Sequence, residues 1–236
     1  MNYKLFVPAV LLIALLISGY GLIGVERIMM RMESQSLQDG KTARVEATLF
    51  YEAHHGRLIT KVESPMQQVM ITNQYGELTI YDPGKNTVFR AQSIEYSSKN
   101  NLIYFFLNGN THDMGLRDMG FSLEHTSFED NLMITRWVPP PSVSNLFSHI
   151  ELVHEDYLPI YAGYFDVNGK LVKKVFYSDY EIYTDVILPF RVTEFNYLPG
   201  GDSIINRITL SDVRFNRQAV SAWFDFKIPE DARLIE

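Results

Sequence analysis

The sequence predicts one mainly β domain with few helices, built on a highly curved antiparallel sheet, and three observations lead to that fold class. Short apolar segments alternate with turn residues at regular intervals over most of the 236 residues, a spacing typical of strands joined by hairpins. No segment has the strand–helix–strand order that a parallel sheet requires. Aromatic residues make up 13% of the chain, with 14 Tyr and 15 Phe, and they favour strands. A sheet this long does not stay flat, so we expect a barrel or half-barrel.

An apolar segment precedes the predicted domain. Residues 5–24, LFVPAVLLIALLISGYGLIG, contain no charge, and a helix of that length spans a bilayer core of roughly 30 Å. The apolar part also has the length of a signal-peptide core, although Gly19-Tyr20-Gly21 is a poor cleavage site. Residues 1–24 are therefore a signal peptide or a membrane anchor. Both alternatives export a single domain, residues 25–236, across a membrane.

A helix is predicted directly after this segment. Val25, Ile28, Met29 and Met32 follow helical spacing. We predict an amphipathic helix over Val25–Leu37, ended by Asp39-Gly40 and packed on the sheet through Ile28, Met29 and Met32.

The predicted strands lie between turns rich in Gly, Pro, Asn and Asp. They are Val45–Ala53, Arg57–Glu63, Gln68–Thr72, Glu77–Ile80, Thr87–Ala91, the hairpin Ile160–Tyr177, Ile187–Tyr197, Ile204–Phe215 and Ala222–Ile228. Asn168-Gly169 predicts a type I′ turn in the hairpin. Gln92–Gly120 has a mixed pattern, and we expect short helices near Ile94–Ser97 and Met114–Met119.

The composition argues against several functional classes. The chain has no Cys, which excludes disulfides, thiolate metal sites and a Cys nucleophile. Its net charge of −7 comes from scattered acidic residues, whereas nucleic acids require a clustered basic face. No HExxH, GxSxG or phosphate-loop motif is present. We therefore expect a protein that is not an enzyme and that has no cofactor, no metal and no nucleic-acid partner.

One segment carries a competing hypothesis, a hydrolase. His149, Glu151, His154 and Asp156 lie close together in sequence. On a strand, His149 and Glu151 would share one face and His154 would take the other. The hydrolase hypothesis requires these groups to converge in three dimensions.

Several strands are apolar on both faces, above all the Ile160–Tyr177 hairpin. A sheet with one face in water alternates more cleanly. Either helices and loops cover the concave face, or that face lines a cavity for an apolar ligand; the pattern alone does not decide between these.

The order of segments resembles the lipoprotein carrier superfamily of the bacterial envelope, which includes the carrier LolA, the receptor LolB and the regulator RseB. The resemblance covers most of residues 25–236. It rests on an amphipathic segment after the export signal, followed by ITKVESPMQQVMITNQYGELTIYDPGKNTVF, LPFRVTEFNY, NRITLSDVRFN and WFDFKIPEDARLI. One departure is that Glu63 and Ser64 precede Pro65, where LolA has a basic residue before a proline.

The resemblance implies an incomplete β-barrel whose open side is covered by a helical lid and whose concave face binds acyl chains. It also implies that the domain lies in the periplasm or on the extracytoplasmic face of the inner membrane. The expected partners are a lipid or an acylated protein, together with inner-membrane partner proteins, and we expect a monomer. The expected function is carriage or sorting of lipoproteins or lipids; the alternative is an RseB-like regulatory or protein-interaction module. We assign Ile28, Met29 and Met32 to the lid or entrance. The apolar lining is predicted from strand alternation as Leu78, Ile80, Phe165, Val172, Leu188, Phe190, Ile208, Leu210, Phe224 and Phe226.

Overall fold

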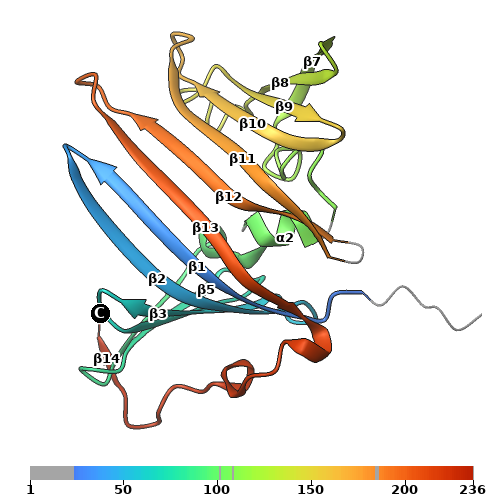
Figure 1. Ribbon diagram of the computed structural model, residues 1–236. Coiled ribbons are helices and arrows are strands. Elements are labelled where there is room, and N and C mark those ends of the chain that lie inside the picture. Colours follow the sequence, from blue (N-terminus) through green and yellow to red (C-terminus); the bar gives the residue numbers. More distant parts are fainter. Residues whose placement is uncertain (1–23, 101, 108, 184–185, 236) are drawn as a thin grey trace, which may run out of the picture.

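The described residues form one open, curved sheet of 14 strands (Figure 1). The computed structural model describes residues 24–100, 102–107, 109–183 and 186–235. The strand order across the sheet is β14-β6-β5-β4-β3-β2-β1-β13-β12-β11-β10-β9-β8-β7. The strands are β1 (Arg27–Gln38), β2 (Lys41–Glu52), β3 (Arg57–Ser64), β4 (Gln68–Thr72), β5 (Glu77–Asp82), β6 (Thr87–Gln92), β7 (Ser122–Glu129), β8 (Leu132–Val138), β9 (His149–Glu155), β10 (Leu158–Phe165), β11 (Leu171–Tyr183), β12 (Val186–Tyr197), β13 (Ser203–Phe215) and β14 (Arg233–Ile235).

The curved antiparallel sheet confirms the predicted mainly β class with few helices, whereas the helical lid stays a prediction. Neighbouring strands pair antiparallel except β14 and β6, which pair in parallel over three residues. Helices are few and short: η1 (Ile94–Tyr96), η2 (Ser98–Asn100), α2 (Leu102–Leu107), η3 (Asn216–Gln218) and η4 (Ala222–Asp225). In the part of the chain that the structure describes, no helix has the length and apolar character to cross a bilayer. Residues 1–23, and the two alternatives for them, lie outside the described residues.

The concave face of the sheet carries the larger core. Helix α2 lies in the hollow between the two ends of the sheet (Figure 1). Its Phe106 packs with Val175 of β11 and Leu188 of β12, whereas its Ile103 packs with Ile28 of β1 and neighbouring residues of β2. The two clusters share partly buried side chains of β12 and β13. They form one continuous apolar layer, which we call the inner core.

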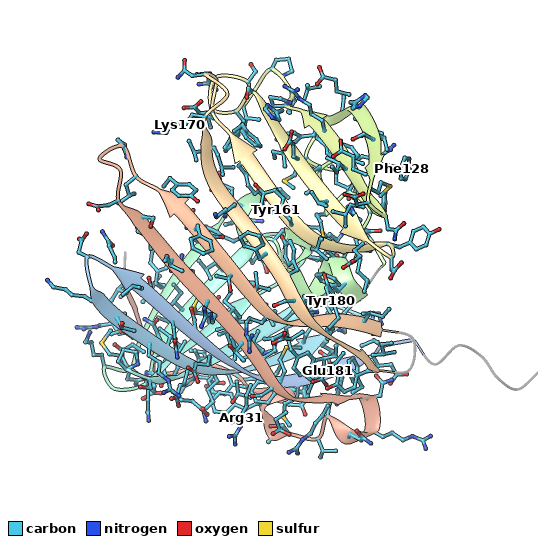
Figure 2. All side chains as sticks on the ribbon, turned by 45° about the horizontal axis from the view of Figure 1, so that its top comes forward. Arg31, Phe128, Tyr161, Lys170, Tyr180 and Glu181 are labelled. Carbon is cyan, nitrogen blue, oxygen red and sulfur yellow. The ribbon has the colours of Figure 1, made fainter. Side chains whose placement is uncertain are left out.

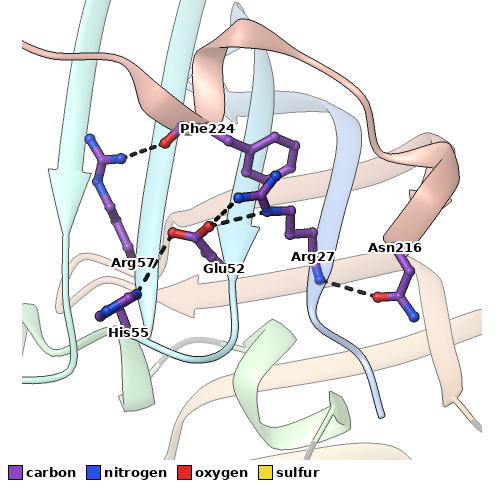
Figure 3. A network of polar contacts seen from close by, with 6 residues as sticks. All are labelled: Arg27, Glu52, His55, Arg57, Asn216 and Phe224. Atoms are coloured by element: carbon purple, nitrogen blue, oxygen red, sulfur yellow. Dashed lines mark hydrogen bonds and ion pairs between the residues drawn. The ribbon is translucent and has the colours of Figure 1, made fainter. Parts of the chain in front are cut away.

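A smaller core lies on the convex face, under the C-terminal segment. Residues 216–232, which we call the strap, run along the outside of the sheet (Figure 1). Phe224 packs on Phe50 and Ile59 of the sheet. The guanidinium of Arg57 donates hydrogen bonds to the carbonyls of Phe224 and Phe226, at 2.5 and 2.6 Å. Arg27 lies over the Phe224 ring and pairs with Glu52 at 2.8 Å (Figure 3).

The helix predicted over Val25–Leu37 is wrong, because Arg27–Gln38 is strand β1. This strand pairs along its whole length with β2, from Arg27 opposite Glu52 to Gln38 opposite Lys41, and it pairs with β13 on its other edge. A helix here would leave two long edges unpaired, and a short isolated helix is marginal in water. Asp39 and Gly40 form a two-residue turn with φ of 50° and 71°, the geometry that Asp-Gly favours in hairpins.

Three other local predictions differ from the structure. Ala222–Ile228 is not a strand: the Ser221 hydroxyl accepts a hydrogen bond from Trp223 N–H at 3.2 Å and begins η4. The turn at Asn168-Gly169 is a longer loop, because Asp166 Oδ1 accepts two backbone N–H groups and only Gly169 has positive φ, 74°. Met114–Met119 forms successive turns, whereas the helix predicted near Ile94–Ser97 is confirmed as η1.

Candidate functional site

The concave face is the candidate site, and its two halves differ. Around α2 the inner core fills it with side chains. The hairpins β1–β2, β10–β11 and β12–β13 extend well beyond α2 (Figure 1). Strand register places half-buried Val45, Ile204 and Asn206 on the concave face of these arms. We call the concave face of these arms the outer groove.

An ion pair lies in the outer groove. Lys173 Nζ is 2.6 Å from Glu194 Oε2, and the two side chains are only 34% and 28% exposed. Asn196 Nδ2 donates to Glu194 Oε1 at 2.6 Å. Burial raises the pKa of Glu194, but hydrogen bonds from Lys173 and Asn196 outweigh it, so the pKa lies below its ordinary value. The Lys173 ammonium also lies 5.4 Å from the centre of the Tyr164 ring. The outer groove is therefore of mixed character, because apolar Val45 and Ile204 lie on the same face as polar Ser34 and Asn206 and a fixed pair of opposite charges.

Eight of the predicted lining and lid residues lie on the concave face. Leu188, Phe190, Ile208 and Leu210 belong to the inner core or pack against it. Leu78 lies opposite Thr72, which lies opposite Leu58 of the inner core. Strand alternation from these positions completes the concave set: Leu78, Ile80, Leu188, Phe190, Ile208, Leu210, Ile28 and Met32.

The other five predicted residues do not lie on the concave face. Phe224, Phe226 and Met29 pack in the smaller core under the strap. Phe165 stacks on His149 at 4.3 Å, on the convex face, and half-buried Val172 belongs to none of the core clusters. The assignment failed where both faces of a hairpin are apolar, and where the segment is not a strand.

Sequence reasoning missed several residues of the concave face. Val192 continues the alternation of Leu188 and Phe190, so the period of two could have found it. Glu194 and Lys173 carry no such signal, because charged residues on a strand are ordinarily solvent-exposed.

The groups of the hydrolase hypothesis do not converge among the described residues. His149 lies on the convex face, with Nε2 3.7 Å from Glu151 Oε1. His154 is buried on the other face, where its Nε2 is 2.9 Å from the Thr111 carbonyl. Asp156 is in the β9–β10 turn. The described residues also contain no group of three His, Cys, Asp or Glu side chains placed to hold a metal.

The buried His154 predicts acid sensitivity. Burial lowers its pKa below the usual 6.5 and outweighs the bond to Thr111, and its Nδ1 has no hydrogen-bond partner among the residues that the structure describes. The unfolded chain therefore binds a proton more readily than the folded one. This contribution to stability is complete above about pH 6.5 and falls as the pH drops towards the folded-state pKa, by at most about 1.4 kcal/mol per pH unit. The free energy of unfolding, measured with urea, should fall less steeply from pH 7 to pH 5 in His154→Gln than in wild type. The exposed His125→Gln is the control, and an unchanged slope in His154→Gln contradicts the prediction.

An aromatic strip lies on the convex face beyond the strap. The Tyr161 and Phe176 rings are 5.3 Å apart, and Phe176 meets Phe195 edge-on at 6.0 Å. Lys174 Nζ lies 4.7 Å from the Phe195 ring centre and 5.7 Å from that of Tyr197. Phe176 is exposed and the other rings are half-buried (Figure 2 labels Tyr161). Exposed aromatic surface of this kind is typical of interaction surfaces.

Comparison with known proteins gives matches only among solved structures. No family model and no curated protein sequence matches the chain. A LolA superfamily protein from Nitrosomonas europaea superposes with a TM-score of 0.56 at 13% identity, covering 86% of this chain and 90% of that one. A putative outer membrane lipoprotein-sorting protein domain from Vibrio parahaemolyticus gives 0.58 at 13%, with 86% and 91% covered. A DUF1329 family protein from Desulfovibrio piger gives 0.58 at 14%, with 85% and 90% covered. The chain therefore has the fold of the LolA superfamily structures.

Proposed function

We propose that this protein binds lipid or lipoprotein acyl chains on its concave face, for their carriage or sorting in the bacterial envelope. The observation that carries the proposal is the continuous apolar layer of the inner core, which runs into the half-buried outer groove. Such a face needs no catalytic group, because affinity grows with the buried hydrocarbon at about 0.8 kcal/mol per methylene. The LolA-like fold supports the same class of ligand.

In this proposal, α2 and residues 109–121 act as the lid. The ring centre of Phe106 in α2 lies 6.4 Å from that of Tyr177 and 6.0 Å from that of Tyr180. Leu116 and Phe121 belong to the same cluster. Movement of this segment would open the inner core to an acyl chain that first enters along the outer groove. Lys173 and Glu194 would then lie beside the polar end of the ligand, where their charges stay partly hydrated.

A pair of neighbouring substitutions tests the groove. Ile204 faces the groove, whereas Ile205 faces the convex side opposite Leu37 and Phe195. Ile204→Trp should displace about four methylenes of a bound chain and weaken the binding of a fluorescent fatty acid about 200-fold. Ile205→Trp adds the same bulk on the other face and should bind as wild type.

Mass spectrometry of lipids that co-purify with the full chain provides the native ligand. Recovery of lipid with wild type and Ile205→Trp, and its loss with Ile204→Trp, would support the proposal. Equal binding by both variants, or no lipid with any of them, would refute it.

A second candidate function is an RseB-like regulatory or protein-interaction module. The aromatic strip on the convex face favours it, because Phe176 is exposed and the Lys174 ammonium lies over both the Phe176 and the Phe195 rings. If this second function is correct, Phe176→Ser should abolish capture of an envelope protein without changing the amount of co-purified lipid. If the protein is only a lipid carrier, Phe176→Ser should change neither protein capture nor lipid content.

A further inference from the structure

One end of the sheet collects the strand ends nearest the N-terminal segment. β1 begins there, and β13 ends beside it, with Ile28 opposite Phe215. The β9–β10 turn lies at the same end, and the β7–β8 turn is its neighbour because Leu132 pairs with Glu155. We call this end the entry rim. It comprises Gly24, the turns at 53–56 and 73–76, the turns at 130–131 and 156–157 with the two strand residues on either side of each, the ends of β11 and β12, and residues 93–97 and 216–220.

Exposed apolar side chains concentrate on the entry rim. Among the described residues, seven large apolar side chains are more than two-thirds exposed. Six of the seven lie on this rim, and only Met66, in the β3–β4 turn, lies at the opposite end of the strands. In Figure 2, Phe128 and Glu181, the neighbour of Ile182, lie on the right, whereas Lys170, at the other end of β11, lies to the upper left. The six are Tyr75, Ile94, Phe128, Tyr157, Ile182 and Val220.

Tyr157 is an unexpected residue for its position. It occupies the second place of a two-residue turn with φ of 66°, after Asp156 at 46°. This left-handed geometry favours Asn or Gly and is costly for an aromatic residue. The equivalent β7–β8 turn uses Asp130 and Asn131 at 47° and 67°. The Tyr157 ring is 89% exposed, so packing within the domain does not offset the cost.

The chain enters the domain on the same rim. Asn216 Nδ2 donates to the Gly24 carbonyl at 3.3 Å, and Asn216 Oδ1 accepts from Glu26 N–H at 2.7 Å (Figure 3 shows Asn216 beside Arg27). The uncharged sequence of residues 5–23 immediately precedes this point. If those residues enter a bilayer, the rim is the part of the domain that meets it.

We propose that the entry rim docks on a lipid bilayer and inserts these six side chains among the headgroups. Tyrosine is enriched at that depth, where its ring is apolar and its hydroxyl is wet. The exposed charges of the rim are mainly acidic, which suits a zwitterionic surface rather than a strongly anionic one. They are Glu95, Glu129, Asp130, Glu155, Asp156 and Glu181, against Arg217. Docking is separate from the ligand site proposed above, since none of the six side chains belongs to the inner core.

Depth-dependent fluorescence quenching in the full chain tests whether the entry rim inserts into a bilayer. The sequence has no Cys, so single fluorophores can be placed at Val220→Cys on the rim and at Met66→Cys and Val167→Cys, on turns at the opposite end. The protein is reconstituted in phosphatidylcholine vesicles with spin-labelled lipid. We expect quenching of the Val220 label and none at positions 66 and 167. Equal quenching at both ends, or none at either, would overturn the proposal.

A variant separates insertion from tethering. Tyr157→Asn, Phe128→Ser and Ile182→Ser remove three rim side chains, and Asn suits the positive φ at 157. Quenching of the Val220 label should fall to the level of the opposite end while the circular dichroism melting curve stays unchanged. Met66→Ser with Val167→Ser is the matched control and should leave quenching intact. Full quenching in the triple variant would mean that tethering alone holds the rim near lipid, which refutes insertion. Lipid recovery by mass spectrometry reports on the proposed ligand site independently.

Discussion

Met30→Asp is expected to prevent folding, with a loss of at least about 5 kcal/mol. Met30 is 1% exposed and lies in the inner core between β2 and β13. The substitution replaces a long apolar side chain with a shorter polar one and places a carboxyl among the apolar side chains of this cluster. The group must either stay charged without hydration or take up a proton, and both cost free energy at neutral pH. A loss of that size equals the whole stability of many domains.

Two neighbouring variants make the result specific to the strand. Arg31 is exposed on the opposite face of β1. The free energy of unfolding of Arg31→Asp should therefore lie within about 0.5 kcal/mol of the wild-type value. Met30→Leu conserves volume and should cost less than about 1.5 kcal/mol. Urea denaturation followed by circular dichroism measures all three. A folded Met30→Asp with a melting curve close to that of Arg31→Asp would show that position 30 faces solvent, as it would on the helix predicted from sequence.

The same segment shows where sequence reasoning reached its limit. Ile28, Met29, Met30 and Met32 are all apolar, so they satisfy a helical stripe and a strand face at once. The choice is made by partners distant in sequence, since β13 provides one edge of β1 almost 180 residues later. Only Asp39-Gly40 carried local evidence for a hairpin, and it is also a common helix end.

Strand faces were predictable where one face is polar. Ile208 and Leu210 alternate with Arg207, Thr209 and Ser211, and both lie on the concave face as expected. The β10–β11 hairpin is apolar on both faces, because one side contributes to the inner core and the other forms the aromatic strip. The alternation then does not indicate which face is concave, and Phe165 was assigned to the wrong face for that reason. The charges of the outer groove were beyond prediction, because pairing within a curved sheet depends on the register of three strands.

Phe224→Ala is expected to cost about 3–5 kcal/mol and to release the strap. The ring is 3% exposed and meets Phe50 edge-on at 5.5 Å. The centre of the ring also lies 5.0 Å from the Arg27 guanidinium, which is itself paired with Glu52. Truncation therefore leaves a cavity in the smaller core and removes a cation–π contact. The hydrogen bonds from Arg57 bind only backbone carbonyls of the strap, so the substitution does not remove them. They would then hold a segment whose main side-chain packing against the sheet is lost.

The comparison that decides this prediction is Val220→Ala, in the same strap but 78% exposed, which should change the free energy of unfolding by less than about 0.5 kcal/mol. Urea unfolding gives the loss for both variants, and limited proteolysis reports whether the strap detaches before the sheet unfolds. If Phe224→Ala lowers the midpoint without changing the urea m-value, the strap and sheet unfold together. Early cleavage within residues 216–232 would mean that the strap opens as a local unit. A loss below about 1 kcal/mol with no added cleavage would contradict the packing of Phe224 against Phe50, because a buried phenylalanine cannot be truncated so cheaply.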